Sequence, residues 1–154
     1  MTISDSGSRG DRNDLSGDVA FELVSREDLD CIRRTIVPDD RGTISETLRE
    51  WCDSGEFDFV LTTGGTGLGP RDITPEATRD VIELEIPGIS EAIRNQTFKQ
   101  TPFAVLSRAV AGVRSRCLII NLPGSPKGVR ESLEVVLPVI PHALQIIKGS
   151  QLHI

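Results

Sequence analysis

The chain has 154 residues, a length at which one domain can bury a hydrophobic core without disulfides or metals. Its 38% hydrophobic content includes five Phe, one Trp and no Tyr, so the core must rest on aliphatic side chains, as in an α/β protein. A net charge of −6 argues against nucleic acid and anionic membranes as partners. With no signal-peptide or membrane-span pattern, we expect a soluble, cytoplasmic protein.

The cysteines and histidines give little support for a metal site. Cys31, Cys52 and Cys117 are odd in number and far apart, which excludes a disulfide framework and a C-x-x-C zinc site. We expect all of them to be free thiols in the core. His142 and His153 are the only histidines, and His142 is expected on the face of a C-terminal helix.

The first half of the chain alternates between loop, helix and strand. The Ser-, Gly- and Asp-rich stretch 4–14 reads as a loop, and Ser16 resembles the N-cap of a following helix. Residues 31–37 have strand character and end at a Pro-Asp turn. The apolar spacing over 44–52 then predicts an amphipathic helix.

The second half repeats this alternation. Predicted strands cover 57–61 and 116–121, and predicted helices run from Thr74 to a stop at Pro87-Gly88, over 90–97, over 129–137 and over 143–148. The segment 101–114 has no clear pattern. Repeated βα units indicate a single-domain α/β sandwich with three layers, in which helices flank a mainly parallel sheet.

The loops after the predicted strands gather the polar residues of the chain. In parallel sheets ligands bind outside the carboxyl ends of the strands. The loops 38–40, 63–72 and 121–127, together with the loop 4–14, are therefore expected to lie on one edge and to form one pocket.

The most informative segment is the glycine-rich turn over residues 62–72, which links a strand to a helix. Backbone N–H groups that converge at a helix N-terminus bind phosphate. The turn fits neither common nucleotide motif, because Pro70 stands where the Rossmann pattern needs its third small residue and no Gly-Lys-Ser/Thr occurs. A phosphorylated small molecule held by another architecture is predicted.

Asp39 and Asp72 are assigned to the same edge, where each would repel an anionic ligand. Mg²⁺ binds one or two carboxylates together with phosphate oxygens, so both aspartates and a nucleotide triphosphate form a coherent set. A simpler reading has Asp72 pairing with Arg71 or capping the Thr74 helix, and Asp39 only shaping a turn. Their proximity to the glycine turn favours the metal or catalytic role.

These segments resemble the molybdopterin adenylyltransferases, which include MogA-like proteins and the G domains of gephyrin and its plant counterpart. The resemblance covers essentially the whole chain and is carried by the motifs at residues 62–67, 70–78, 106–108 and 121–125. It implies a single molybdopterin-binding domain over 1–154 that assembles as a homotrimer. It also implies transfer of AMP from Mg-ATP to the phosphate of molybdopterin, with release of pyrophosphate.

The resemblance assigns roles residue by residue. Asp39 and Asp72 match the catalytic, metal-associated aspartates. The nucleotide-binding turn matches Thr63, Gly64, Gly65, Thr66 and Gly67, and the pterin-binding positions match Ser107, Arg108, Asn121, Pro123 and Gly124. The Ser4-Asp5-Ser6 run resembles a further motif of the family and is expected to line the same pocket, unless it is only a terminal loop. Lys127 reads as a solvated surface residue.

The chain departs from the family at its start, where only Met1, Thr2 and Ile3 precede the Ser-Asp motif. The first strand is therefore expected to be a truncated stub. One alternative function is a MoaB-like molybdopterin-binding protein with little or no catalytic activity. A scaffolding role like that of gephyrin is disfavoured, and a molybdenum-insertion protein is a candidate downstream partner.

Overall fold

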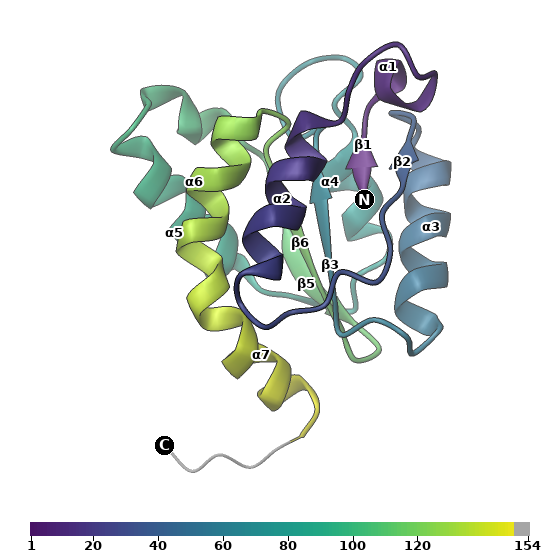
Figure 1. Cartoon of the computed structure of the whole chain (residues 1–154), viewed down its shortest axis with the longest axis vertical. Helices are drawn as coiled ribbons and strands as arrows, with labels where there is room; N and C mark the ends of the chain where they lie inside the picture. The colour runs from purple at the N-terminus through teal and green to yellow at the C-terminus, as the bar shows by residue number, and fades with distance from the viewer. Residues whose placement is uncertain (150–154) are drawn as a thin grey trace.

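The computed structural model describes residues 1–149 and shows a single α/β unit (Figure 1). The strands are β1 (Thr2–Ile3), β2 (Ile36–Val37), β3 (Phe59–Thr63), β4 (Leu84–Glu85), β5 (Ala111–Arg114) and β6 (Cys117–Leu122). They form one sheet in the order β2-β1-β3-β6-β5-β4. The first four strands of this order are parallel to one another. Strand β5 pairs antiparallel with β6, and β4 pairs antiparallel with β5.

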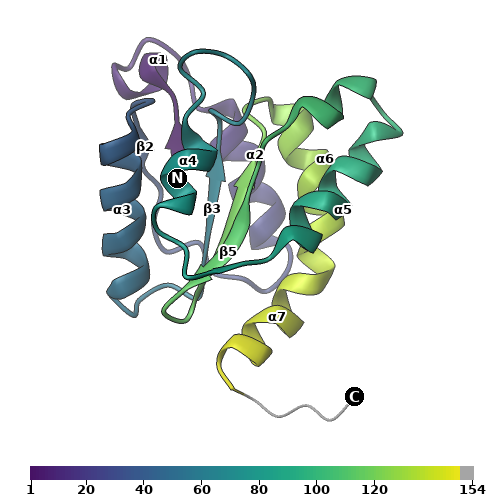
Figure 2. The same cartoon turned by 180° about the vertical axis from the view of Figure 1, so that it is seen from behind.

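Helices cover both faces of the sheet. They are α1 (Asp5–Ser8), α2 (Leu15–Ser25), α3 (Arg41–Asp53), α4 (Thr74–Arg79), α5 (Pro87–Phe98), α6 (Pro126–Val136) and α7 (Ile140–Ile147), with the 3₁₀ turns η1 (Pro102–Leu106) and η2 (Leu137–Val139). Figure 1 shows α2 and α6 in front of the strands, and Figure 2 shows α4 on the opposite face. The predicted three-layer sandwich is confirmed. Within residues 1–149, no helix has both the length and the apolar character needed to cross a bilayer.

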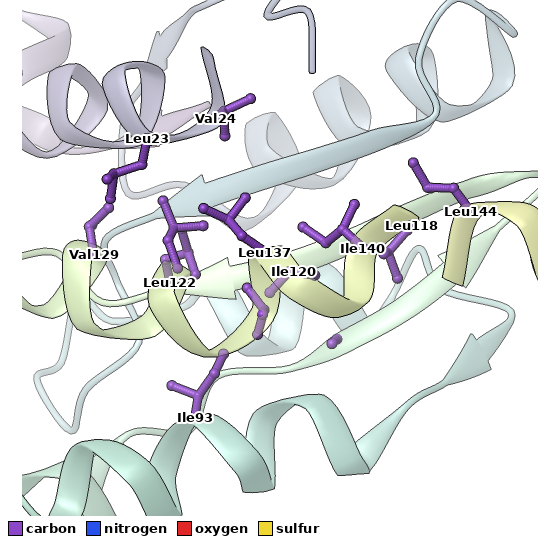
Figure 3. Close-up of a cluster of buried hydrophobic side chains, with 13 residues drawn as sticks. Leu23, Val24, Ile93, Leu118, Ile120, Leu122, Val129, Leu137, Ile140 and Leu144 are labelled. Carbon is purple, nitrogen blue, oxygen red and sulfur yellow. The ribbon is translucent and has the colours of Figure 1, made fainter. Parts of the chain in front are cut away.

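Strand β6 divides the core into two halves because its side chains alternate between the faces. Leu118, Ile120 and Leu122 pack against α2, α5, α6 and α7 (Figure 3). Cys117 and Ile119 pack against α3 and α4 on the other face. All six residues of this central strand are buried, so β6 anchors the sheet from which the carboxyl-edge loops emerge.

Two predictions for the first half are wrong. Asp14, not Ser16, caps α2, because the Asp14 side chain accepts a hydrogen bond from the Gly17 amide at 2.9 Å. Only Ile36 and Val37 of the predicted strand 31–37 pair with the sheet, because their neighbour β1 is itself only two residues long. The 4–14 loop also contains the short helix α1.

The predicted helix from Thr74 to Pro87 ends at Arg79. The chain then adds β4 to the sheet edge, where the amides of Glu83 and Ile86 donate to β5 carbonyls at 2.8 Å each. Pro87 begins α5 instead of ending a helix, as expected for proline in a first turn. The partner strand β5 lies in segment 101–114, whose sequence has no clear secondary-structure pattern. Strand β4 therefore could not be predicted.

The remaining elements are present with displaced ends. The strands predicted at 57–61 and 116–121 are β3 and β6, and the last helix, α7, begins three residues earlier than predicted, at Ile140. His142 is exposed on that helix, as predicted, whereas His153 lies outside the described residues. Cys52 and Cys117 are buried, but Cys31 is exposed, so its assignment to the core is wrong.

Candidate functional site

The loops that follow β1, β2, β3 and β6 meet at the carboxyl edge of the sheet. They enclose a cavity of about 240 Å³ that also receives the loop before α2. Its lining includes Ser4, Gly7, Arg12, Asn13, Asp14, Ser16, Asp39, Thr63, Gly64, Gly65, Asp72 and Gly124. The expectation that Asp39 and Asp72 share one edge with the glycine turn is therefore confirmed.

The glycine turn has a backbone conformation that favours glycine. Gly64 and Gly65 have φ values of 105° and 65°. A Cβ on Gly64 would stand 2.3 Å from the Ile3 carbonyl oxygen, and one on Gly65 would stand 2.4 Å from Thr74 Oγ1. Thr74 fixes the turn by donating from Oγ1 to the Gly64 carbonyl at 2.9 Å. The glycines thus let β3 pass closely against β1 and the start of α4.

Asp39 and Asp5 are joined by two hydrogen bonds, each from the backbone amide of one residue to the carboxylate of the other. The Asp5 amide donates to Asp39 Oδ2 at 2.9 Å, and the Asp39 amide donates to Asp5 Oδ1 at 3.0 Å. Arg71 then donates two hydrogen bonds of 3.1 Å to the Asp5 carboxylate. The loops after β1, β2 and β3 are joined in this way.

These two carboxyl groups have opposite pKa shifts. Burial raises the pKa of Asp39, and the negative charges of Asp5 and Asp72 add to this effect. The pKa of Asp5 is lowered, first by the hydrogen bond from the Asp39 amide and then by Arg71. Burial is therefore the largest effect on the Asp39 carboxyl group, and it outweighs the opposing hydrogen bond from Asp5 and the charge of Arg71.

Both simpler interpretations of Asp72, pairing with Arg71 and capping the Thr74 helix, are wrong. Its Oδ2 atom accepts a hydrogen bond from the Gly69 amide at 2.8 Å, and Arg71 pairs with Asp5 instead. The N-cap of α4 is Ile73, which makes no side-chain cap bond. The carboxylate of Asp72 thus lies within the curve of its own glycine-rich loop, at the cavity lining.

The Arg108 side chain is hydrogen-bonded to the backbone of the glycine-rich loop that contains Asp72. Its Nε donates to the Gly67 carbonyl at 2.8 Å, its Nη2 donates to the Asp72 carbonyl at 2.9 Å, and its Nη1 contacts Glu76. The Arg108 amide also donates to the Thr66 carbonyl at 2.9 Å. Thr66 and Gly67 are held by these bonds and do not line the cavity that contains Gly64 and Gly65.

Ser107 and Arg108 line a second cavity of about 310 Å³, which shares no lining residue with the first. Arg79, Arg94 and Ser90 also line it. Of the predicted pterin positions, Ser107 and Arg108 line this second cavity, whereas Gly124 lines the first cavity together with the predicted nucleotide positions. Arg108 is hydrogen-bonded to the loop between Gly67 and Asp72.

Asn121 is fully buried beneath the loops. Its Nδ2 donates to Thr62 Oγ1 at 2.9 Å and to Thr78 Oγ1 at 3.0 Å, and its Oδ1 accepts from the Val110 amide at 3.1 Å. The side chain joins β3, β6, α4 and the segment before β5, and it reaches neither cavity.

Two other predicted positions close the loop after β6. The Pro123 carbonyl accepts from Thr63 Oγ1 and the Gly124 carbonyl accepts from Ser16 Oγ, both at 2.6 Å. Lys127 is exposed, as predicted. Arg12 and Asn13 also line the first cavity, and no sequence motif identifies them beyond their place in the 4–14 loop.

The donor set suits a cation that is shared with phosphate. Within residues 1–149, no cluster of three or more His, Cys, Asp or Glu side chains is arranged to hold a metal by itself. Mg²⁺ that is bound with a triphosphate needs only one or two protein carboxylates, and Asp39 and Asp72 are two carboxylates in the lining of the same cavity.

The fold and the cavity define an α/β protein with a polar ligand site at the carboxyl edge of its parallel strands. Residues 1–142 match the family model described as "Probable molybdopterin binding domain". The chain belongs to this family.

Named relatives agree with this assignment. A Helicobacter pylori molybdopterin adenylyltransferase is 44% identical over 156 residues, covering 100% of this chain and 89% of the relative. A structure of MoaB, a molybdopterin biosynthesis enzyme from Thermus thermophilus, is 50% identical with a TM-score of 0.91, covering 97% of this chain and 94% of the other. A MogA structure is 38% identical with a TM-score of 0.90, covering 95% of each chain.

Proposed function

We propose that this chain is a molybdopterin adenylyltransferase, which joins AMP from Mg-ATP to the phosphate of molybdopterin and releases pyrophosphate. The observation that carries the proposal is the cavity in which Asp39, Asp72 and the glycine turn meet. The activity named for the Helicobacter pylori relative supports it.

Within this proposal, the residues of the first cavity other than Gly124 bind the nucleotide. The turn at Thr63, Gly64 and Gly65 faces the phosphates, and Thr66 and Gly67 maintain its shape. Asp39 and Asp72 hold Mg²⁺, which neutralises the triphosphate when it is bound. The raised pKa of Asp39, caused first by burial, supports this role because a cation would relieve the unfavourable charge. Arg12 adds positive charge beside the phosphates.

The pterin is assigned to Ser107, Arg108, Pro123 and Gly124, while Asn121 orients the strands beneath them. The attacking group is the phosphate of molybdopterin, whose second pKa of about 6 makes it an anionic nucleophile at neutral pH. No strong general base is required. Catalysis then consists of alignment with the α-phosphorus and charge neutralisation.

A second candidate is a molybdopterin-binding protein without efficient catalysis. The similarity to a MoaB structure, at 50% identity, is the reason to test this MoaB-like candidate, although that structure is described as an enzyme. The two candidates share the fold and the pterin site, and they differ in whether bound Mg-ATP is turned over.

The proposal also includes a homotrimer in the cytoplasm, where ATP is available, and transfer of the product to a molybdenum-insertion protein. Apolar side chains exposed around η1 support self-association, because such patches mark interfaces. Phe98, Phe103, Val105 and Leu106 are 52%, 74%, 59% and 48% exposed.

The test measures pyrophosphate release from Mg-ATP with and without added molybdopterin. We expect release that depends on molybdopterin, and we expect Asp72→Asn to reduce turnover at least about tenfold while retaining fold and pterin binding. Asp58→Asn, which alters an exposed carboxylate paired with Lys148, is the matched control and should retain activity. Pterin binding without release would favour the second candidate, and an unchanged Asp72→Asn rate would remove Asp72 from the mechanism.

A further inference from the structure

The second cavity, which Ser107 and Arg108 line, also contains a buried hydroxyl group without a partner. Ser90 lies near the start of α5, lines this cavity and is only 4% exposed. Its Oγ atom makes no hydrogen bond to any group within residues 1–149. Buried polar groups are almost always paired, so an unpaired hydroxyl at a cavity indicates a partner from outside the chain.

Two arginines at this cavity are already bound to the protein. Arg108 donates to two carbonyls of the glycine-rich loop and contacts Glu76. Arg94 donates from Nη1 to two carbonyls of the segment 107–109, at 3.3 Å each. These bonds fix the wall of the cavity and use much of the donor capacity of both guanidinium groups.

Arg79 and Glu85 form a further charged pair at the same cavity. Arg79 Nη2 lies 3.9 Å from Glu85 Oε1, which is too long for a direct hydrogen bond. Glu85 is held in β4, where it pairs with Gly112, and it is the one acidic side chain that lines this cavity in the described part of the chain. The cavity therefore presents a carboxylate acceptor and a guanidinium donor side by side.

We propose that Glu85 and Arg79 recognise the pyrimidinone edge of the pterin ring, and that Glu85 selects a ring with a 2-amino group. This inference rests on the proposed molybdopterin site. A pterin presents its 2-amino group and N3–H as donors, next to its 4-oxo oxygen as an acceptor. The Glu85 carboxylate accepts from both donors, and Arg79 donates to the oxygen. The Ser90 hydroxyl donates to a ring nitrogen.

The size and position of the cavity agree with this role. Its volume of about 310 Å³ is at the lower end of the range for small-molecule pockets and suits a bicyclic ring. Arg108 lines this cavity and donates from Nη2 to the carbonyl of Asp72, which lines the first cavity. A ligand with its ring in the second cavity can therefore extend its phosphate along this loop toward the nucleotide.

The test is a fluorescence titration of the full-length protein, without ATP, with 6-hydroxymethylpterin and with 6-hydroxymethyllumazine. The lumazine carries an oxygen in place of the 2-amino group and so presents an acceptor to the Glu85 carboxylate. We expect the wild type to bind the pterin at least about tenfold more tightly than the lumazine. Glu85→Gln, whose amide both donates and accepts, should reduce this preference to less than about threefold.

Two further variants separate ring recognition from structural effects. Glu91→Gln changes an exposed carboxylate of α5 that does not line the cavity, so it is the matched control and should keep the preference. Ser90→Ala should weaken the binding of both rings without lowering Tm, because the hydroxyl has no partner within residues 1–149. Unchanged affinity in Ser90→Ala, or a lower Tm, would remove Ser90 from the ring site.

The inference would be overturned by a wild type that binds neither ring or binds both equally, and by an unchanged preference in Glu85→Gln. These outcomes are independent of catalysis because the titration contains no ATP. A ring preference without pyrophosphate release would support the ring site and count against adenylyl transfer. Pyrophosphate release without a ring preference would support adenylyl transfer and count against the ring site.

Discussion

Asn121 is the residue whose replacement best separates a structural role from direct contact with ligand. Its amide makes three hydrogen bonds inside the sheet, to Thr62, Thr78 and Val110, and none of its surface is exposed. Replacement by alanine removes all three bonds and leaves the Val110 N–H without its side-chain acceptor. The change alters no group that lines either cavity.

The expected loss of stability follows from these contacts. A hydrogen bond inside a protein contributes about 1 kcal/mol net, and a buried donor left unpaired costs about 1–3 kcal/mol. The two threonine hydroxyls can rotate to new partners, whereas the Val110 amide is fixed in the backbone. We therefore expect Asn121→Ala to reduce the free energy of unfolding by about 3 kcal/mol, which corresponds to a fall in Tm of about 6–12 °C for a domain of this size.

Urea denaturation at a fixed protein concentration measures this loss, with an unchanged m-value showing that the transition is still comparable. Asn95→Ala, at an exposed position of α5, is the matched control and should change stability by less than about 0.5 kcal/mol. If Asn121→Ala were as stable as the wild type but failed to bind pterin, the structural role would be refuted and direct contact favoured.

Two further substitutions probe the carboxyl-edge cavity. Burial and the neighbouring charges of Asp5 and Asp72 raise the pKa of Asp39, so ionisation of this side chain destabilises the fold as the pH rises above about 4, the ordinary aspartate pKa. Asp39→Asn should therefore gain Tm relative to the wild type between about pH 4 and pH 7. The same variant should lose adenylylation activity. A relative Tm that falls over that range would contradict this sign. Gly64→Ala should reduce the free energy of unfolding by about 2 kcal/mol or more, because φ is 105° and the new Cβ would stand 2.3 Å from the Ile3 carbonyl oxygen. Gly88→Ala is the control, because a Cβ there has nothing within 4 Å, and it should be neutral or stabilising in thermal melts. Equal Tm values for the two alanine variants would show that the turn can relax.

The sequence predicted the meeting of Asp39, Asp72 and the glycine turn because one rule, the common edge of parallel strand ends, positions all three. It did not reveal that Asn121 lies inside the sheet. A signal was available, since the alternation of Leu118, Ile120 and Leu122 toward one face places Asn121 on the opposite face with Ile119. Motif matching identifies residues of a site but does not give the direction of their side chains.

The antiparallel edge formed by β4 and β5 could not be predicted from the sequence for a different reason. Strand β4 has only two residues, both exposed, and it exists because β5 offers it backbone partners. A segment of this kind has no apolar period of its own. The same dependence limits β2, which extends only as far as β1 can pair with it.

The cavity concentrates charge that folding alone would not favour. Asp5 is paired with Arg71, whereas Asp39 accepts a hydrogen bond from the Asp5 amide and lies partly buried beside the charge of Asp72. The glycine turn adds positive φ angles and close backbone contacts that favour glycine at Gly64 and Gly65. Fully buried β6 and the packed helices on both faces provide the stability that offsets this local strain. This concentration of charge supports the proposed Mg-ATP site, because a cation shared with phosphate oxygens would complement the carboxylates of Asp39 and Asp72.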